Sequence, residues 1–351
     1  MKIEMRTDNR FLNTLRQLGD AEADALVDEL FLQKRQGELY TLLQQSEAFL
    51  SATNSSPIAT FILSRKKNPE WYTKERILRG QQVFGEYASE IMMLLGAMAL
   101  PYCYAASPGN KALYLSDKMR QSPGKRLLDT AKFLIGVSSP GALTTNNSGH
   151  IHINKTRLIH AIARYHVKRG AWDMTWGEPI NQEDMAGTNL AFSVVILLGL
   201  QQSGFVLSPQ QKNDFIYLWR YIGYQLAIDE TLLPESYLEG YRLAQVIKRR
   251  NFKKSMEGVE LTKALLNYYK SVVPKDQTLL IESQINYLVG SQVGGYLGLK
   301  RNTFADRMTS FLSASKEVKN FLLPHQSTFE AMLRQHRLLQ DTVTLTIGRS
   351  K

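Results

Sequence analysis

Apolar side chains recur along this chain with the period of a helix, and very little of it alternates like a strand. Residues 11–45 carry apolar positions three and four apart, which is the spacing of one helix face. A second helix is predicted over 75–100, because Thr73 can cap its start and Pro101 can end it. The same spacing predicts further helices over 129–136, from 154 or 156 to 168, and over 189–202, 208–228, 235–250, 259–273 and 276–289, resuming from 302, whereas 342–347 alternates like a strand.

The chain contains no internal repeat, low-complexity linker or heptad array, so we predict an all-α fold built as one large helical domain. Residues 1–70 are predicted to be accessory helices packed on a main unit of 71–351. The longest apolar run, 91–106, contains Pro101 and is shorter than the roughly 20 residues that a membrane-spanning helix needs. Residues 1–17 are charged and lack a signal-peptide core, so no transmembrane segment and a cytoplasmic location are expected.

The net positive charge indicates possible anionic partners, and the cysteine content excludes some kinds of site. A net charge of +11 favours nucleic acid, anionic lipid or an anionic cofactor. The densest basic stretch, 248–254, is more typical of a solvated surface, and no nucleic-acid recognition motif accompanies it. The single cysteine, Cys103, excludes a disulfide framework and a cysteine-based zinc site.

The most specific chemistry is predicted on the helix around His160. Arg157, His160 and Arg164 are three and four residues apart, so they share one face. An imidazole between two guanidiniums suits an anionic, metal-centred cofactor. The alternative is a core histidine satisfied by a neighbouring carboxylate, and the spacing alone favours that alternative. Di-iron, zincin, hydrolase and phosphate-loop motifs are all absent from the sequence.

Six blocks in order carry a resemblance to a known family. They are Arg79-Gly80-Gln81-Gln82-Val83-Phe84, then Leu100-Pro101 with Tyr104-Ala105, Arg126-x-x-x-Thr130, Arg157-Leu158-Ile159-His160-Ala161 with Arg164, the ten residues 179–188 (PINQEDMAGT), and Trp219-Arg220-Tyr221-Ile222-Gly223-Tyr224. Together they cover roughly 75–300, and 179–188 is the most specific. The chain resembles the MpaB-type oxygenases and latex-clearing rubber oxygenases, which share a haem-binding catalytic domain.

The resemblance implies a mostly helical fold with a globin-like core around haem b in 71–351. It implies that His160 is the proximal iron ligand. It further implies that Arg126 and Thr130 lie on the distal side, that Arg157 and Arg164 surround the ligand helix, and that Thr188 lies near the pocket.

Asp129 is a departure from the family, because rubber oxygenases have a lysine there that can occupy the sixth iron position. A carboxylate beside iron is costly unless it is paired, and Arg126 is three residues away. We therefore predict an Arg126–Asp129 ion pair on the distal side. The alternative is that Asp129 is a helix N-cap.

The family resemblance favours a haem b-dependent oxygenase that adds dioxygen across a carbon–carbon double bond of an apolar, unsaturated or isoprenoid substrate. Its partners would be dioxygen, that substrate and an electron donor, with no specific nucleic acid. Two alternatives stay open: a haem-binding sensor or carrier without oxygenase activity, and a basic helical nucleic-acid-binding protein.

Overall fold

A computed structural model describes residues 8–52, 56–116, 123–145, 148–272 and 278–300. Helices make up the regular structure of this part, and its one contact of strand type is an isolated bridge between Ala106 and Phe252. The all-α prediction is confirmed for these residues. The strand predicted over 342–347 and the helices predicted from 302 lie outside them.

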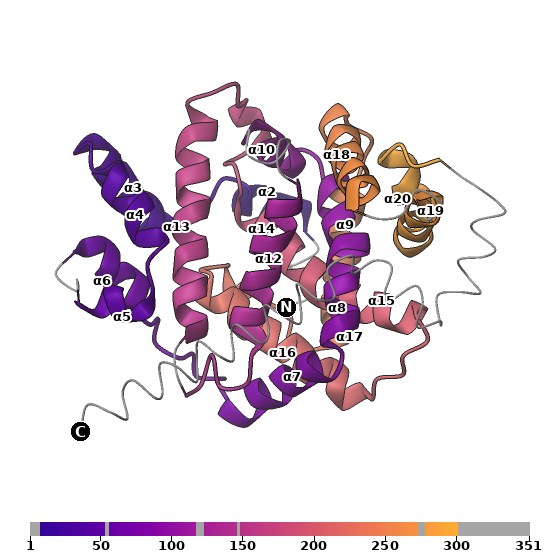
Figure 1. Cartoon of the computed structure of the whole chain (residues 1–351), viewed down its shortest axis with the longest axis horizontal. Helices are drawn as coiled ribbons and strands as arrows, with labels where there is room; N and C mark the ends of the chain where they lie inside the picture. Colours follow the sequence, from indigo (N-terminus) through magenta and orange to yellow (C-terminus); the bar gives the residue numbers. More distant parts are fainter. Residues whose placement is uncertain (1–7, 53–55, 117–122, 146–147, 273–277, 301–351) are drawn as a thin grey trace.

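Five short helices begin the described part of the chain. They are α2 (Asn9–Leu15), α3 (Ala21–Leu32), α4 (Gln36–Leu43), α5 (Glu47–Ala52) and α6 (Pro57–Leu63). Three of them, α2 to α4, fall where a helical pattern over 11–45 was predicted. Asp20 interrupts the pattern because its side chain accepts a hydrogen bond from Ala23 N and thereby caps α3. In Figure 1, α3–α6 lie on the outer side of α13 (Ser148–Lys168).

The middle of the chain supplies the central helices. They are α7 (Lys74–Glu86), α8 (Ala88–Leu94), η1 (Leu95–Ala99), α9 (Leu100–Ala105), α10 (Gly109–Leu115), α12 (Pro123–Ser138), α13, α14 (Gln182–Leu190), η3 (Ala191–Val195), α15 (Ile196–Gln202) and α16 (Pro209–Gln225), with 3-10 turns η2 (Met174–Trp176) and η4 (Glu230–Leu232). The last described helices are α17 (Tyr237–Asn251), α18 (Met256–Val272), α19 (Thr278–Val289) and α20 (Ser291–Tyr296).

Pro101 does not end its helix, contrary to the sequence prediction. The segment η1 just before it is a turn of π-helix, in which Leu100 N donates to Leu95 O five residues back. A π-turn already departs from the usual bonding pattern, so the missing proline N–H is tolerated there. Two other starts also move: α12 begins at Pro123 and α13 at Ser148, both earlier than predicted.

Two helical stretches cross the middle of the fold. Ala88–Ala105 and Gln182–Gln202 are long and apolar enough to span a membrane by length and composition, and 72% and 78% of their most apolar windows are buried within the protein. Their π-helical segments η1 and η3 contact each other. Core helices pass the same test, so this observation is weak evidence for a membrane span.

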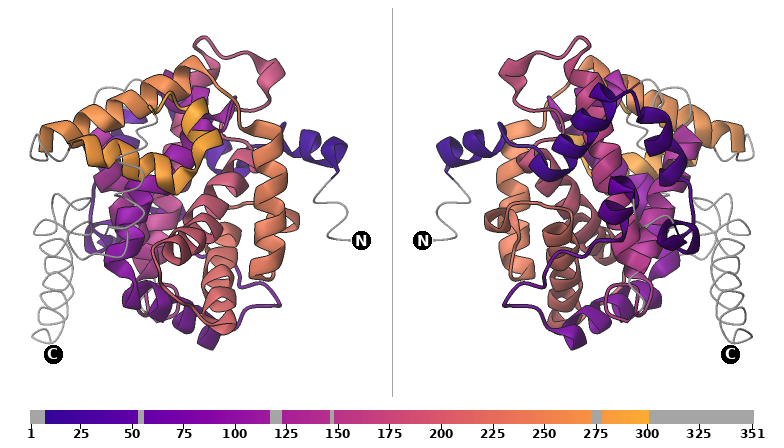
Figure 2. Two further views of the ribbon diagram at one scale, coloured as in Figure 1. Left: turned by 90° about the vertical axis from the view of Figure 1, so that its right-hand side faces the viewer. Right: turned by 90° about the vertical axis from the view of Figure 1, so that its left-hand side faces the viewer.

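The hydrophobic core of the described residues has two large parts that meet at α13, and a small third cluster of Ala112, Val167 and Trp172. The larger part contains α7–α9, α12, α14–α20 and also Leu12 and Leu15 of α2. The smaller part lies between α3–α6 and the outer face of α13, where Leu158 and Ala161 contribute. The right-hand view of Figure 2 shows these N-terminal helices in front of the main body.

The motif Arg79-Gly80-Gln81 is explained by packing. Arg79 Nε donates to Asp214 Oδ2 at 2.6 Å, which ties α7 to α16. Gln81 is buried, donates to Val137 O and accepts from Gly141 N. At Gly80 a Cβ would lie 2.5 Å from Asp214 O and 2.6 Å from Leu218 Cβ. This close approach of two helices requires glycine.

We expect Gly80→Ala to destabilise the protein by about 1–3 kcal/mol, because the added methyl overlaps backbone that cannot move aside. Gly85 lies on the same helix, is exposed, and has open space around a Cβ. Gly85→Ala should therefore stabilise the helix by about 0.5–1 kcal/mol. Urea unfolding of both variants measures the difference, and equal effects would contradict the packing argument.

Candidate functional site

The α12–α13 hairpin brings the predicted distal residues to the level of His160. Nine residues of sequence, 139–147, separate the two helices, and the helices pack against each other. Near this end of the helices a Cβ on Gly136 would overlap the His152 ring, so these positions face each other. Both helices rise 1.5 Å per residue in opposite directions. His160 lies eight residues after His152, and the middle of 126–130 lies eight residues before Gly136. The two sites are therefore at the same level along the hairpin.

His160 is directed toward the main body of the protein. Ile153 and Val167, seven residues to either side, lie on the same face, and both pack into cores on the inner side of α13. His160 is half-buried. The pKa of its imidazole is lowered to about 4, chiefly by burial and then by the charge of Arg164, while the charge of Asp20 acts in the opposite direction. The ring is therefore neutral at pH 7, and no hydrogen bond to it is found among the described residues.

The two arginines that flank His160 are held by carboxylates of the N-terminal segment. Arg157 donates from Nε and Nη2 to Asp20 at 2.7 and 2.9 Å, and from Nη2 to Glu22 at 2.7 Å. Arg164 donates from Nε to Asp24 Oδ1 at 2.7 Å. Arg164 Nη1 donates to the Ile180 carbonyl at 3.1 Å. Within the described residues, the buried Arg164 Nη2 is left without a partner.

Arg126 presents a second unpaired guanidinium nitrogen on the α12 side. Its Nη1 is buried and has no hydrogen-bond partner in the described part of the chain. The guanidinium carbon lies 5.4 Å from the centre of the Tyr104 ring on α9. Burial raises the pKa of the neighbouring Cys103 thiol to about 11, although Arg126 and a hydrogen bond with Thr188 act against it. α9, α12 and α14 therefore meet around Arg126.

The two predicted threonines bond to their own helices. The Thr130 hydroxyl donates to Arg126 O at 2.9 Å. The Thr188 hydroxyl donates to Asp184 O at 3.0 Å and also contacts Cys103. Thr188 thus reaches the same region as Arg126, through the cysteine.

Asp129 differs from the prediction made for it. Its side chain is 53% exposed and accepts from Lys125 Nζ at 3.1 Å, one turn back on the surface of α12. It pairs with Lys125, so the expected Arg126–Asp129 pair does not form. The N-cap alternative fails as well, because Asp129 lies inside α12, which begins at Pro123. Exposure explains why no pair with Arg126 is needed, since water and Lys125 solvate the carboxylate.

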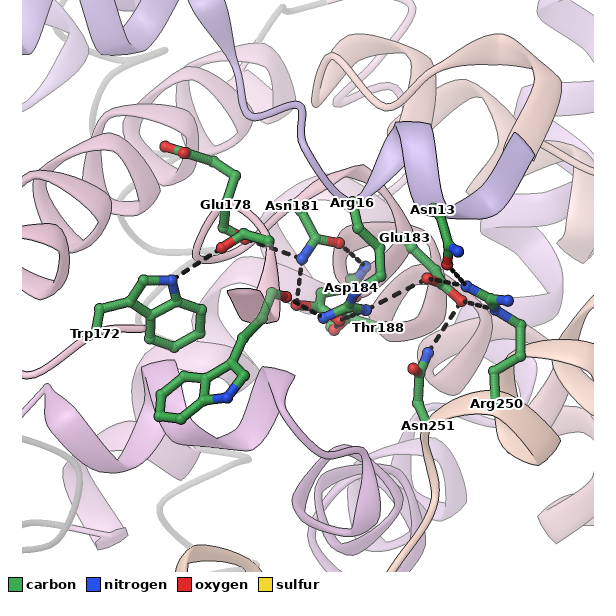
Figure 3. Close-up of polar contacts among 12 residues, drawn as sticks. Asn13, Arg16, Trp172, Glu178, Asn181, Glu183, Asp184, Thr188, Arg250 and Asn251 are labelled. Carbon is green, nitrogen blue, oxygen red and sulfur yellow. Dashed lines mark hydrogen bonds and ion pairs between the residues drawn. The ribbon is translucent and has the colours of Figure 1, made fainter. Parts of the chain in front are cut away.

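The polar block 179–188 begins α14 and binds the N-terminal segment (Figure 3). Asn181 caps the helix by accepting from Asp184 N at 2.9 Å. Arg16 Nη1 donates to Glu183 at 3.3 Å and to Asp184 at 3.0 Å, and its Nη2 donates to Trp176 O at 3.0 Å. Backbone bonds from Glu178 N to Arg16 O and from Gln182 N to Leu18 O complete the junction.

Glu183 is the most deeply buried carboxylate of this network, with no exposed surface. Arg250 at the end of α17 donates to it from Nε at 2.8 Å, and Asn251 donates at 3.1 Å. Arg250 also reaches Asn9 and Asn13 of α2. Three helices distant in sequence therefore meet at one charge.

Two polar cavities flank the ion-pair network around Glu183, and their lining residues do not include His160. The larger, about 610 Å³, is lined by Asn9, Asn13, Arg16, Val246, Arg249, Arg250 and Asn251. The other, about 440 Å³, is lined by Asn13, Arg16, Gln17, Ser107, Pro108, Lys111, Thr175, Trp176, Gly177 and Lys253. Neither includes a residue of α12 or α13. No cluster of three or more histidine, cysteine, aspartate or glutamate side chains that could hold a metal ion occurs in the described ranges.

Comparison with known proteins decides the family. Residues 85–298 match the catalytic domain of the ER-bound oxygenase mpaB/B'/rubber oxygenase family. The chain belongs to this family. A rubber oxygenase from Streptomyces sp. (strain K30) is 21% identical over 296 residues, which span 82% of this chain and 72% of that protein. The fold is similar to a latex clearing protein in the closed state, with a TM-score of 0.72 and 19% identity over 91% of this chain and 90% of that one.

The sequence analysis missed the acidic partners on the N-terminal segment. The first turn of α3 explains its acidic residues locally: Asp20 is the N-cap, and Glu22 and Asp24 follow it. Nothing in that pattern indicates a second role in binding α13. The ion pairs of these three carboxylates with α13 span 135–140 positions. Arg16 and Arg250 were missed for the same reason. The one signal in the sequence was that Glu183 and Asp184 are adjacent carboxylates with no lysine or arginine beside them, so their cations must come from distant parts of the chain.

We expect Glu183→Ala to destabilise the protein by about 3–5 kcal/mol, because it leaves Arg16 and Arg250 partly buried without their shared carboxylate. Glu235 offers a matched control, since its pair with Arg220 is 45% exposed on the glutamate side. Glu235→Ala should cost at most about 1 kcal/mol. Chemical denaturation tests both, and a loss below about 1 kcal/mol in Glu183→Ala would show that the network is dispensable.

Proposed function

We propose that this oxygenase-family protein binds haem b and uses it to oxidise an apolar, unsaturated substrate, with cleavage of a carbon–carbon double bond. The observation that carries the proposal is the neutral, unpaired His160, which lies at the level of Arg126 across the α12–α13 hairpin. Family membership supplies the oxygenase class. The rubber oxygenase and latex clearing protein matches favour an isoprenoid hydrocarbon as the substrate.

The described residues fit haem in two respects. A neutral imidazole is the form of histidine that ligates iron, and His160 has the depressed pKa that keeps it neutral. The buried guanidinium nitrogens Arg126 Nη1 and Arg164 Nη2 lack partners among the described residues. Buried N–H groups without acceptors are costly. A carboxylate group of haem is an acceptor of the right charge for Arg164, whereas Arg126, on the opposite helix, stays available to the reaction with dioxygen. Arg157 has its carboxylate partners already.

Haem b, when bound, supplies the reaction with dioxygen, and the protein supplies positioning and electrostatics. His160 would hold the iron from α13. Arg126 would offer a hydrogen bond from the opposite helix to an oxygen atom in the space between them. Thr130 contributes less as a donor, because its hydroxyl already bonds to the Arg126 carbonyl. Tyr104 of α9 lies beside Arg126, and Leu127 of α12 lies against Gly96 of η1, so apolar side chains border this part of α12.

The proposal further includes an external electron donor. It also includes a cytoplasmic location, which cell fractionation would test.

A haem-binding sensor or carrier is the second candidate. It is favoured by one observation: an exposed aspartate occupies the position of the family's distal lysine. Incubation of the purified protein with dioxygen, a reductant and a short polyisoprenoid separates the two, because only an oxygenase yields carbonyl-containing cleavage products. The nucleic-acid alternative predicts salt-dependent binding to generic DNA instead.

We expect the purified protein to show a Soret band that His160→Ala abolishes. His166 lies on the same helix but is exposed, and its ring contacts Tyr40 and Phe31. His166→Ala should therefore keep the wild-type spectrum. The visible spectra of wild type and both variants after haemin addition are the measurement. A wild type that takes up no haemin refutes haem binding, and an unchanged His160→Ala moves the ligand elsewhere.

We expect Arg126→Gln to lower product formation by about 10–100-fold, because a buried positive donor beside the reacting atoms is lost. Asp129→Asn should change product formation by less than twofold, since the carboxylate is solvated and pairs only with Lys125 on the helix surface. Turnover per bound haem is the quantity to compare. A larger loss in Asp129→Asn than in Arg126→Gln would restore Asp129 to the distal side.

A further inference from the structure

The segment 16–24, between α2 and the first turn of α3, runs beside the face of α13 that carries His160. Arg16 anchors one end of the segment to Glu183 and Asp184. Asp24 anchors the other end to Arg164. Asp20 lies between these anchors and pairs with Arg157, one helical turn before His160. The segment is therefore fixed at three points around the candidate ligand.

Asp20 is the central point of this arrangement. It is only 4% exposed, and both of its carboxylate oxygens accept from Arg157 in a bidentate pair. One of these oxygens also caps α3 by accepting from Ala23 N at 3.3 Å. Because Arg157 is three residues before His160 on α13, this pair brings the buried Asp20 carboxylate to the ligand turn of the helix.

We propose that Asp20 is a positioning residue for His160: through the buried Arg157 pair it fixes the rotation of the ligand turn of α13 and places a negative charge behind the imidazole. The proposal rests on the haem-binding function proposed above. Residues that orient a metal ligand from behind change metal affinity by about 10–100-fold when they are removed. Negative charge on that side also stabilises the ferric state relative to the ferrous state.

Glu22 provides a matched control on the same arginine. It accepts from Arg157 Nη2 at 2.7 Å, as closely as Asp20, but its side chain is 68% exposed. Water and salt screen its charge, and a single exposed ion pair contributes little. A general effect of weakening Arg157 would appear in both variants, whereas positioning by the buried carboxylate appears at Asp20 alone.

The test compares haemin binding to apo wild type, Asp20→Asn and Glu22→Gln, together with the reduction potential of each haem complex and the melting temperature of each apo-protein. Asparagine caps helices about as well as aspartate, so Asp20→Asn removes the charge and keeps the cap. We expect its haemin dissociation constant to rise at least about tenfold and its potential to become more positive. Glu22→Gln should change the dissociation constant by less than threefold.

Each outcome decides one question. If wild type does not bind haemin, the proposed function fails, and Asp20 has no iron ligand to position. If wild type binds and Asp20→Asn matches Glu22→Gln in affinity and potential, the positioning role is overturned. Should Asp20→Asn not fold, Asp20→Glu decides. It keeps the charge but displaces Arg157 by a methylene, so weaker haemin binding at a near-wild-type potential supports the proposal, and wild-type affinity overturns it.

Discussion

The buried carboxylate of Glu183 constrains how α2, α14 and α17 meet. A carboxylate without exposed surface is costly unless cations and hydrogen bonds neutralise it. Arg16 supplies one cation from the end of α2, and Arg250 supplies the other from the end of α17. Neither guanidinium is close to α14 in sequence. The first turn of α14 can therefore form in its observed surroundings only when both distant segments are docked on it.

The same logic continues along the N-terminal segment. Asp20 and Asp24 neutralise Arg157 and Arg164, which would otherwise be buried positive charges beside half-buried His160. The helices before residue 70 were expected to be accessory, yet α2 contributes Leu12 and Leu15 to the main core. Ion pairs then extend that contact to the ligand helix. The N-terminal segment thus forms one wall of the candidate site.

Much of the helical architecture could be predicted from periodicity, because a helix face is a local property of the sequence. The capping box at Ser208 and the helix over 209–225 follow from such local signals. Pro101 misled the prediction because the π-turn that accommodates it has no sequence signature. The ion pairs of Arg157 and Glu183 could not be predicted at all, since their partners lie 137 and 167 positions away. For Asp129 the spacing to Arg126 and to Lys125 was equally suitable, and exposure decided between them.

The blocks that carry the family resemblance serve two different physical purposes. Gly80 and its neighbours, and most of 179–188, are satisfied by contacts within the protein, so they maintain the fold whatever the substrate is. Arg126 and His160 are different: the buried Arg126 Nη1 has no partner among the described residues, and half-buried His160 makes no hydrogen bond to them. An unsatisfied buried group costs stability, and a bound group that supplies the missing partner recovers it. The fold can therefore be shared across the family while the chemistry depends on the few groups left unpaired between α12 and α13.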